Sequence, residues 1–218
     1  MMSRALKAAF YRIAGPAMLL NAAFYRLFRA HGKSPLKIHL GPGQRNYIQG
    51  WVNVDANMFT GRCDLWLDLN NNLPFRDGSV DAAYSHHVME HLSDMPRHLA
   101  DIRRCLKPGG IYRIGVPNAD SAMMKFMEGD PSWFGDFPDK RRSVGGRLDN
   151  FLLCRNEHLA VMTESYLREL LEDAGFTGCR KFSPSATSGA IDLFRDCLAK
   201  EEESDPQYPH TLILEATK

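Results

Sequence analysis

The sequence lacks three features, and each absence excludes some classes of protein. Its five cysteines are scattered, odd in number and never spaced C-x-x-C, which argues against a disulfide framework or a zinc knuckle and fits a reducing cytosol. The uncharged stretch between Arg12 and Arg26 has only 13 residues, too few to span a bilayer. Acidic side chains are absent from residues 1–54, which contain eight basic ones, whereas the remainder carries 19 basic and 26 acidic residues. We therefore expect a cytoplasmic protein with a basic N-terminus.

This charge asymmetry indicates a polyanionic neighbour, such as a membrane surface, a nucleic acid or an acidic partner. Residues 3–30 have the periodicity of one or two helices, and Gly15-Pro16 favours a break between two. One apolar stripe follows the break: Leu19, Leu20, Ala23, Phe24, Leu27 and Phe28. The favoured interpretation is a helix that covers the domain's own core. A helix that lies on anionic lipid at the inner face of the membrane stays open, through residues 1–30. A signal peptide fits less well, because the apolar face continues past any cleavage point.

Residues 36–218 form the main domain, after a basic amphipathic segment of residues 1–35. Strand patterns alternate with helical ones, which predicts one three-layer α/β sandwich. We expect strands at 38–40, 51–54, 64–67, 80–85, 111–116, 176–182 and 211–216. Between residues 119 and 157 the alternation gives way to an irregular insertion rich in Gly, Pro, Met, Phe and Trp. Such insertions are usually functional, and we interpret this one as a lid or substrate cap. The acidic run 201–206 is expected to be solvated.

The stretch from Lys37 to Asp55 predicts a cradle for a nucleoside-like ligand. Its sequence, KIHLGPGQRNYIQGWVNVD, reads as a strand, a glycine turn, a short crossover and a second strand that ends in a carboxylate. A dinucleotide is disfavoured, because the third glycine of G-x-G-x-x-G is replaced by Asn46. The crossover of residues 41–50 also leaves no room for a full helix under a pyrophosphate. At most one or two helical turns fit there, around residues 46–49.

Six segments in a fixed order resemble the class I S-adenosylmethionine-dependent methyltransferases, and specifically the methyltransferase type 11 domains. They are HLGPG (39–43), GWVNVD (50–55), DLWLDL (64–69), LPFRDGSVDAAYSHHVMEHL (73–92), LKPGGIYRIGVPN (106–118) and LRELLEDAGF (167–176). The resemblance implies a Rossmann-like sandwich with a mainly parallel seven-stranded sheet and an antiparallel C-terminal strand. It also implies S-adenosyl-L-methionine as the cofactor.

The same resemblance assigns residues to the cofactor. Gly41 and Gly43 would let the main chain approach its methionine part, and Asp55 would accept hydrogen bonds from both ribose hydroxyls. Asp68 would accept one from the adenine amino group, with Leu69 beside the ring. At the sulfonium end the resemblance places Ser85 and His86.

A cluster of histidines and one glutamate follows the fourth strand. His87, Glu90 and His91 match the H-x-x-E-H signature of some metalloproteases, but that signature requires a helix inside a protease fold. A divalent metal at these residues resembles the E-x-x-E-H site of some quinone O-methyltransferases and stays open. The favoured interpretation assigns no metal ligand: Glu90 meets main-chain N–H groups at a helix N-terminus, and His91 packs inward.

Methyl transfer to a hydroxyl needs a base with a pKa near neutrality, and histidine suits this role best. The candidates are His87, at the end of the fourth strand, and His158, where the insertion ends. Tyr84 and Trp133 are expected to shape the pocket.

The function expected from the sequence is methyl transfer to a hydroxyl of a small molecule or a glycan. Two alternatives stay open: a membrane-associated methyltransferase that acts on a lipid or quinone, and a non-catalytic module that binds the cofactor or a partner. No nucleic-acid substrate is expected, because SHHV stands where the N/D-P-P-Y/F signature of amino-group methylation would follow the fourth strand.

Overall fold

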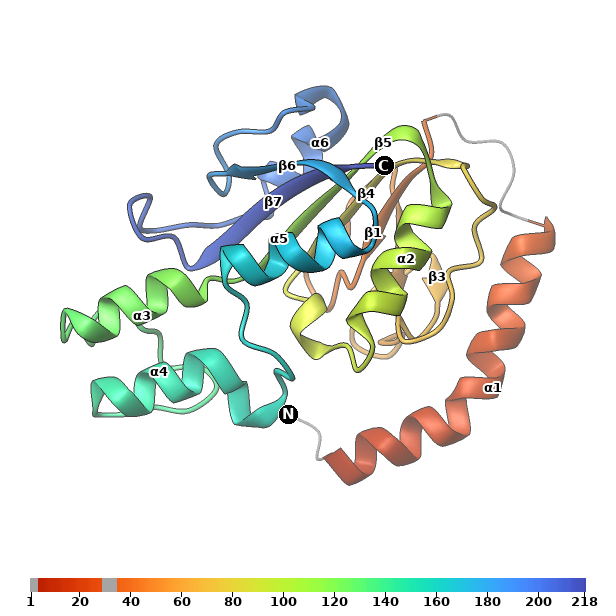
Figure 1. Ribbon diagram of the computed structural model, residues 1–218. Coiled ribbons are helices and arrows are strands. Elements are labelled where there is room, and N and C mark those ends of the chain that lie inside the picture. The colour runs from red at the N-terminus through yellow and green to blue at the C-terminus, as the bar shows by residue number, and fades with distance from the viewer. Residues whose placement is uncertain (1–3, 29–34) are drawn as a thin grey trace.

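A single seven-stranded sheet forms the centre of the computed structural model, which describes residues 4–28 and 35–218 (Figure 1). The strands are β1 (Lys37–Leu40), β2 (Val52–Asp55), β3 (Leu65–Trp66), β4 (Val80–His86), β5 (Leu106–Pro117), β6 (Thr177–Phe182) and β7 (Thr211–Thr217). Their spatial order is β3-β2-β1-β4-β5-β7-β6. Adjacent strands from β3 to β5 are parallel, and β7 runs antiparallel to both β5 and β6. The predicted fold class is confirmed.

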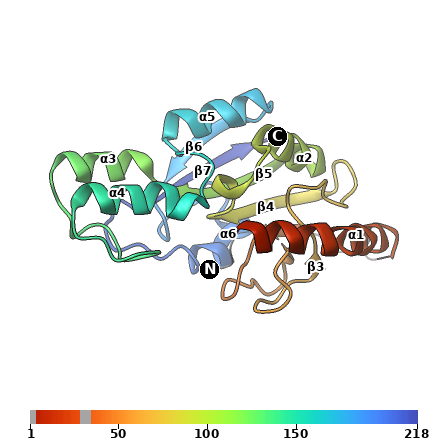
Figure 2. The ribbon, with the colours of Figure 1, turned by 90° about the horizontal axis from the view of Figure 1, so that it is seen from below.

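Helices cover both faces of this sheet, and Figure 2 shows α2 and α5 on one side and α6 on the other. The helical elements are α1 (Arg4–Phe28), η1 (Met89–His91), α2 (Met95–Cys105), α3 (Ala119–Met127), α4 (Val144–Leu153), η2 (Cys154–Asn156), α5 (Glu164–Asp173) and α6 (Ile191–Leu198). Side chains of β4 alternate between the two layers, as the pleat requires. Ala83 packs in the layer with α2 and α5, whereas Ala82 and Tyr84 pack against Phe194 of α6.

The N-terminal segment is one continuous helix, α1, although Pro16 lies inside it. Proline cannot donate a hydrogen bond to the preceding turn, which explains why α1 bends midway in Figure 1. The break expected at Gly15-Pro16 is therefore wrong, and the alternative of a single helix holds. No helix among the described residues is long and apolar enough to cross a membrane.

The stripe of α1 that packs on the domain is not the stripe that the sequence indicated. The buried residues are Ala14, Met18, Ala22 and Tyr25, which recur at helical spacing along the edge formed by β3. In the docked stripe the Tyr25 ring packs edge-to-face on Phe75, with ring centroids 5.7 Å apart. The six residues of the predicted stripe are all exposed. The outward face of α1 is consequently apolar.

The first crossover contains turns and no helix. Gly41 and Gly43 both have positive φ, +70° and +57°, a conformation that glycine adopts at little cost. Gly41 also lies close to the side chain of Val88: a Cβ at position 41 would stand 2.4 Å from a Val88 methyl carbon. Because β2 and β4 flank β1 on opposite sides, this glycine turn lies at the topological switch point, where open α/β sheets bind ligands.

Residues 119–157 are not an irregular insertion, because they contain helices α3 and α4, which pack on each other. Trp133 and Phe134 are buried beside them, and Trp133 Nε1 donates a hydrogen bond to the Tyr208 carbonyl over 2.7 Å. Helix α4 was not predicted from the sequence because Gly145 and Gly146 occupy its first turn, and glycine disfavours the helical conformation. Tertiary packing overrides that preference. The segment forms a cap at one end of the sheet (Figure 1).

The acidic run 201–206 begins in the core, which contradicts the expectation that it is solvated. Arg113 of β5 is fully buried, and Glu201 receives two hydrogen bonds from it, each over 2.7 Å. Glu215 of β7 accepts a third, over 2.6 Å. A buried guanidinium needs such carboxylates, and the sequence alone does not reveal that Arg113 is buried.

Candidate active site

The predicted cofactor residues meet at the carboxyl ends of β1, β2 and β3. Asp55 Oδ2 accepts a hydrogen bond from the Gly43 main-chain N–H over 2.8 Å, so the carboxylate holds the glycine turn in place. Its Oδ1 accepts from the Asn57 N–H over 2.8 Å. The side chain is only partly buried, and each carboxylate oxygen can accept a further hydrogen bond. Asp55 and the turn therefore fit a ligand with hydroxyl donors.

Asp68 lies at the same edge, just past β3. Its Oδ1 accepts hydrogen bonds from the main-chain N–H and the side-chain amide of Asn70, over 2.9 and 3.0 Å. The carboxylate is partly exposed, while the neighbouring Leu69 is 8% exposed. A fixed acceptor beside an apolar side chain suits an adenine ring with an exocyclic amino group.

Helix α1 contributes residues to this edge that the sequence did not predict. Burial raises the pKa of Tyr11 to about 12, and the negative charges of Asp68 and Asp55 add to the effect, so the phenol lies near both predicted cofactor carboxylates. Farther toward the N-terminus, Lys7 forms an ion pair with Glu157 of the cap. No sequence pattern distinguishes Tyr11 and Lys7 from other residues of an amphipathic helix.

Ser85 and His86 direct their side chains into the protein. Ser85 Oγ is 2.7 Å from the Tyr112 hydroxyl and completely buried. The His86 ring stacks on Tyr84 with centroids 6.4 Å apart, and burial lowers the pKa of His86 well below its usual value. A contact of these two residues with the cofactor would therefore use their main chain.

Tyr84 and Trp133 do not shape the pocket, so these two predictions are wrong. Tyr84 is fully buried between the sheet and α6, and Trp133 lies in the core of the cap. Both are large aromatic side chains whose burial was not evident from their positions in the sequence.

His87 adopts a conformation that is uncommon for a residue with a side chain, with φ +55°. Its N–H donates to the Gly115 carbonyl over 2.9 Å, and Nε2 lies 3.1 Å from Thr211 Oγ1. These contacts direct Nδ1 to 3.4 Å from Glu90 Oε1. The strained residue is thus held by two neighbouring strands, as is common at functional sites.

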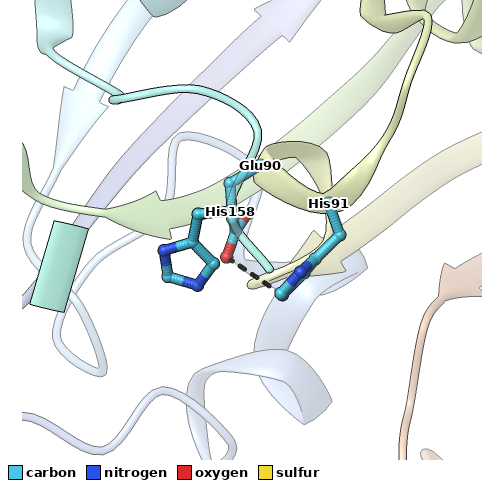
Figure 3. A group of neighbouring side chains, drawn as sticks. All are labelled: Glu90, His91 and His158. Carbon is cyan, nitrogen blue, oxygen red and sulfur yellow. Dashed lines mark ion pairs between the residues drawn. The ribbon is translucent and has the colours of Figure 1, made fainter. Parts of the chain in front are cut away.

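Glu90, His91 and His158 lie against one another (Figure 3). Each offers one ligand atom, and these atoms lie within 4.8 Å of one another. Glu90 and His91 belong to η1, whereas His158 follows η2, 67 positions further along the chain than His91. The Leu159 N–H donates to the Glu90 carbonyl over 2.6 Å and joins the two segments.

The electrostatics favour a charged Glu90 and a neutral His158. Burial by itself would raise the pKa of Glu90, but contacts with His87 and His91 outweigh it and lower that pKa below its usual value. Burial lowers the pKa of His158, and the Glu90 charge offsets this only in part. The cluster therefore contains a buried carboxylate beside an imidazole that is available as a base or ligand.

A pocket of about 400 Å³ opens over this cluster. Lys7 of α1 also lines it, so three separate parts of the chain enclose the same space. Other side chains that line the pocket come from the sheet edge and the cap, among them His87, His91, Phe137, Asn150, Phe151 and His158. The pocket is apolar toward the cap and holds imidazoles toward β4, next to the switch point. It can therefore receive an organic molecule and place a polar atom of it near histidine nitrogens.

The fold, the glycine turn and the two strand-end carboxylates define a class I methyltransferase. A family model described as a methyltransferase domain matches residues 23–180, and the chain belongs to this family. The chain is 29% identical to a probable S-adenosylmethionine-dependent methyltransferase of Mycolicibacterium smegmatis over 48% of its own length and 31% of that protein. It spans at most half of the length of the three curated relatives compared.

Two solved structures share the fold. An S-adenosylmethionine-dependent methyltransferase from Archaeoglobus fulgidus aligns over 92% of this chain and 94% of its own, with 15% identity and a TM-score of 0.52. Phosphoethanolamine N-methyltransferase 2 of Haemonchus contortus, in complex with S-adenosyl-L-methionine, aligns over 92% and 52%, with 12% identity and a TM-score of 0.52. The family membership confirms the predicted cofactor, S-adenosylmethionine.

Proposed function

We propose that this protein transfers a methyl group from S-adenosylmethionine to a hydroxyl of a small molecule or glycan held in the pocket under the cap. The observation that carries the proposal is the position of the pocket. It lies beside the carboxyl end of β4, next to the switch point, and His87, His91 and His158 line it. An acceptor there would meet both the cofactor edge and a base.

The cofactor would be held by Gly41, Gly43, Asp55, Asp68 and Leu69, in the roles that the family resemblance implies. The carboxylates and the glycine turn stand in a fixed arrangement in this structure. S-adenosylmethionine supplies a methyl group on a sulfonium, and loss of that group leaves S-adenosylhomocysteine. The protein's task is then to hold the acceptor oxygen in line with the methyl carbon.

His87 is the residue best placed to take the acceptor's proton. Its Nδ1 lies 3.4 Å from Glu90 Oε1, where a carboxylate stabilises an imidazolium, so Nε2, which lies 3.1 Å from the Thr211 hydroxyl oxygen, is the atom that would take the proton. His158 is the second candidate, because it lines the same pocket. An acceptor hydroxyl that gives its proton to either imidazole becomes a stronger nucleophile toward the methyl carbon.

Replacing His87 with alanine is expected to lower turnover about 100-fold or more, the usual contribution of a positioned base. Turnover is measured by release of S-adenosylhomocysteine on a panel of sugars and phenols, using an acceptor that the wild type methylates. His158→Ala tests the second candidate in the same assay. Affinity for S-adenosylhomocysteine should stay unchanged in both variants. Near-wild-type turnover in both would reject histidine base catalysis.

A second candidate function is methylation of a lipid or quinone at a membrane, and the outward face of α1 supports it. Ile13, Leu20 and Leu27 recur every seven residues and are 80%, 74% and 69% exposed. Every charged residue in positions 1–54 is basic, as on helices that lie on anionic lipid. Because Lys7 of this helix also lines the pocket, a membrane bound by α1 would lie close to the pocket.

A relative from Lactobacillus johnsonii is named demethylmenaquinone methyltransferase; it is 24% identical over 56% of this chain and 50% of its own length.

Vesicle flotation distinguishes the two candidates. The wild type is expected to bind vesicles with anionic phosphatidylglycerol and not neutral phosphatidylcholine ones. Leu20→Glu combined with Leu27→Glu should reduce that binding about tenfold or more, since each change removes apolar burial and adds repulsion. Met127→Glu is the matched control, because Met127 is 80% exposed on α3. Equal flotation of all three proteins, or none of the wild type, would reject membrane docking through α1.

A further inference from the structure

We propose that Glu90, His91 and His158 form a binding site for a divalent transition-metal cation at the base of the pocket. The sequence favoured an interpretation without a metal ligand, and the metal set that it left open contained His87 in place of His158. The structure brings His158 to the cluster from the far end of the cap. The site thus joins η1 to the segment after η2 (Figure 3).

The first observation is the state of the Glu90 carboxylate. Its side chain is 0% exposed. Among the described residues, neither of its oxygens has a hydrogen-bond partner. A buried carboxylate in this condition is costly, and proteins retain one mainly where it pairs with a charge or a metal. His87 Nδ1 and His91 Nε2 approach Glu90 Oε1 only to 3.4 and 3.9 Å. The carboxylate therefore faces a space bordered by imidazole nitrogens.

The second observation concerns the tautomers of the two histidines. His91 Nδ1 lies 3.0 Å from the Glu157 carbonyl, and His158 Nδ1 lies 2.9 Å from the Leu152 carbonyl. A carbonyl oxygen only accepts hydrogen bonds, so Nδ1 carries the proton in both rings and Nε2 presents its lone pair. Metal-binding histidines usually donate their other N–H to a carbonyl or carboxylate in this way. Both rings are thus oriented as ligands before a cation arrives.

The ligand set selects the kind of cation. Two imidazoles and one carboxylate suit Zn²⁺, Mn²⁺, Fe²⁺ or Co²⁺, whereas Mg²⁺ and Ca²⁺ prefer oxygen ligands. Ligands about 2.1 Å from a tetrahedral Zn²⁺ stand about 3.4 Å apart, and the ligand atoms here lie within 4.8 Å. Binding therefore needs a movement of about 1 Å inward, within the range of side-chain rotation.

Three protein ligands leave at least one position open toward the pocket, as catalytic metal sites do. If the proposed hydroxyl methylation is right, an acceptor oxygen on the cation would lose its proton more easily. His158 would then serve as a ligand, and proton uptake would fall to His87 alone. This consequence rests on the proposed function, whereas the metal site itself does not.

The test is metal binding to the full chain without any acceptor. The protein is dialysed against a chelator, then against buffer, and titrated with Co²⁺ and Zn²⁺. Bound Co²⁺ should produce visible absorption bands with a stoichiometry of one, and Zn²⁺ should displace it. Mg²⁺ at the same concentration should displace little. Glu90→Gln and His158→Ala should each weaken Co²⁺ binding at least about tenfold.

Glu157→Gln is the matched control, since its side chain pairs with Lys7 and not with the cluster. It should bind Co²⁺ as the wild type does. Binding of S-adenosylhomocysteine and the melting temperature show whether each variant is folded, and His91→Ala replaces any that is not. A wild type without a bound cation, or variants that all bind it equally, would overturn the site. A loaded protein that methylates no hydroxyl would instead count against the proposed function alone.

Discussion

Replacing Asp55 with alanine is expected to weaken binding of S-adenosylhomocysteine by at least about 100-fold. In the proposed cofactor site its carboxylate accepts hydrogen bonds from both ribose hydroxyls, and a hydrogen bond to a charged group contributes about 1.5–3 kcal/mol. Two of them account for about 3 kcal/mol or more, which corresponds to a factor of about 100 or more in the dissociation constant. The same carboxylate also holds the Gly43 N–H, so the glycine turn loses its anchor as well. Isothermal titration calorimetry measures the effect.

Asp192→Ala is the control for this experiment, because its carboxylate is 93% exposed and pairs with Arg195 along α6. Its affinity for S-adenosylhomocysteine should equal that of the wild type. Asp55→Asn separates charge from shape, since an amide keeps one acceptor oxygen. An unchanged affinity in Asp55→Ala would remove Asp55 from the cofactor site, whatever the acceptor is.

Replacing Glu201 with alanine is expected to destabilise the fold by about 3 kcal/mol. The change removes the carboxylate that receives two hydrogen bonds from the buried Arg113, and of the two carboxylates described beside the guanidinium Glu215 remains. Breaking a buried ion pair from one side usually costs about 3–5 kcal/mol. For a chain of this size, the melting temperature should fall by roughly 6–12 °C. Urea denaturation followed by circular dichroism measures the change in free energy of unfolding.

The neighbouring Glu202 is exposed and provides a matched control, since Glu202→Ala removes the same chemical group one position away. Its free energy of unfolding should stay within about 0.5 kcal/mol of the wild type, as for most surface substitutions. If Glu201→Ala were equally harmless, the buried position of Arg113 between Glu201 and Glu215 would be incorrect.

Much of the fold could be predicted from local patterns. Val80–His86 and Thr211–Thr217 are largely apolar runs of strand length, and Thr163 caps the start of α5, with its Oγ1 accepting from the Tyr166 N–H over 3.3 Å. These signals depend on neighbours within a few residues, so the sequence contains them directly. The packed stripe of α1 and the helix α4 were not predictable, because each depends on what the rest of the chain places against it.

The site divides in the same way. Gly41, Gly43 and Asp55 stand at strand ends within one β-crossover-β unit, so the sequence alone indicated a nucleoside-like ligand at the carboxyl edge, and the resemblance to a family indicated S-adenosylmethionine. Only the tertiary structure decided three other features. It brings His158 beside Glu90 and His91, it brings Lys7 and Tyr11 of α1 to the site, and it buries Glu201. All of them join segments far apart in the chain. Such contacts follow from how whole elements pack, and no local pattern of residue types specifies that.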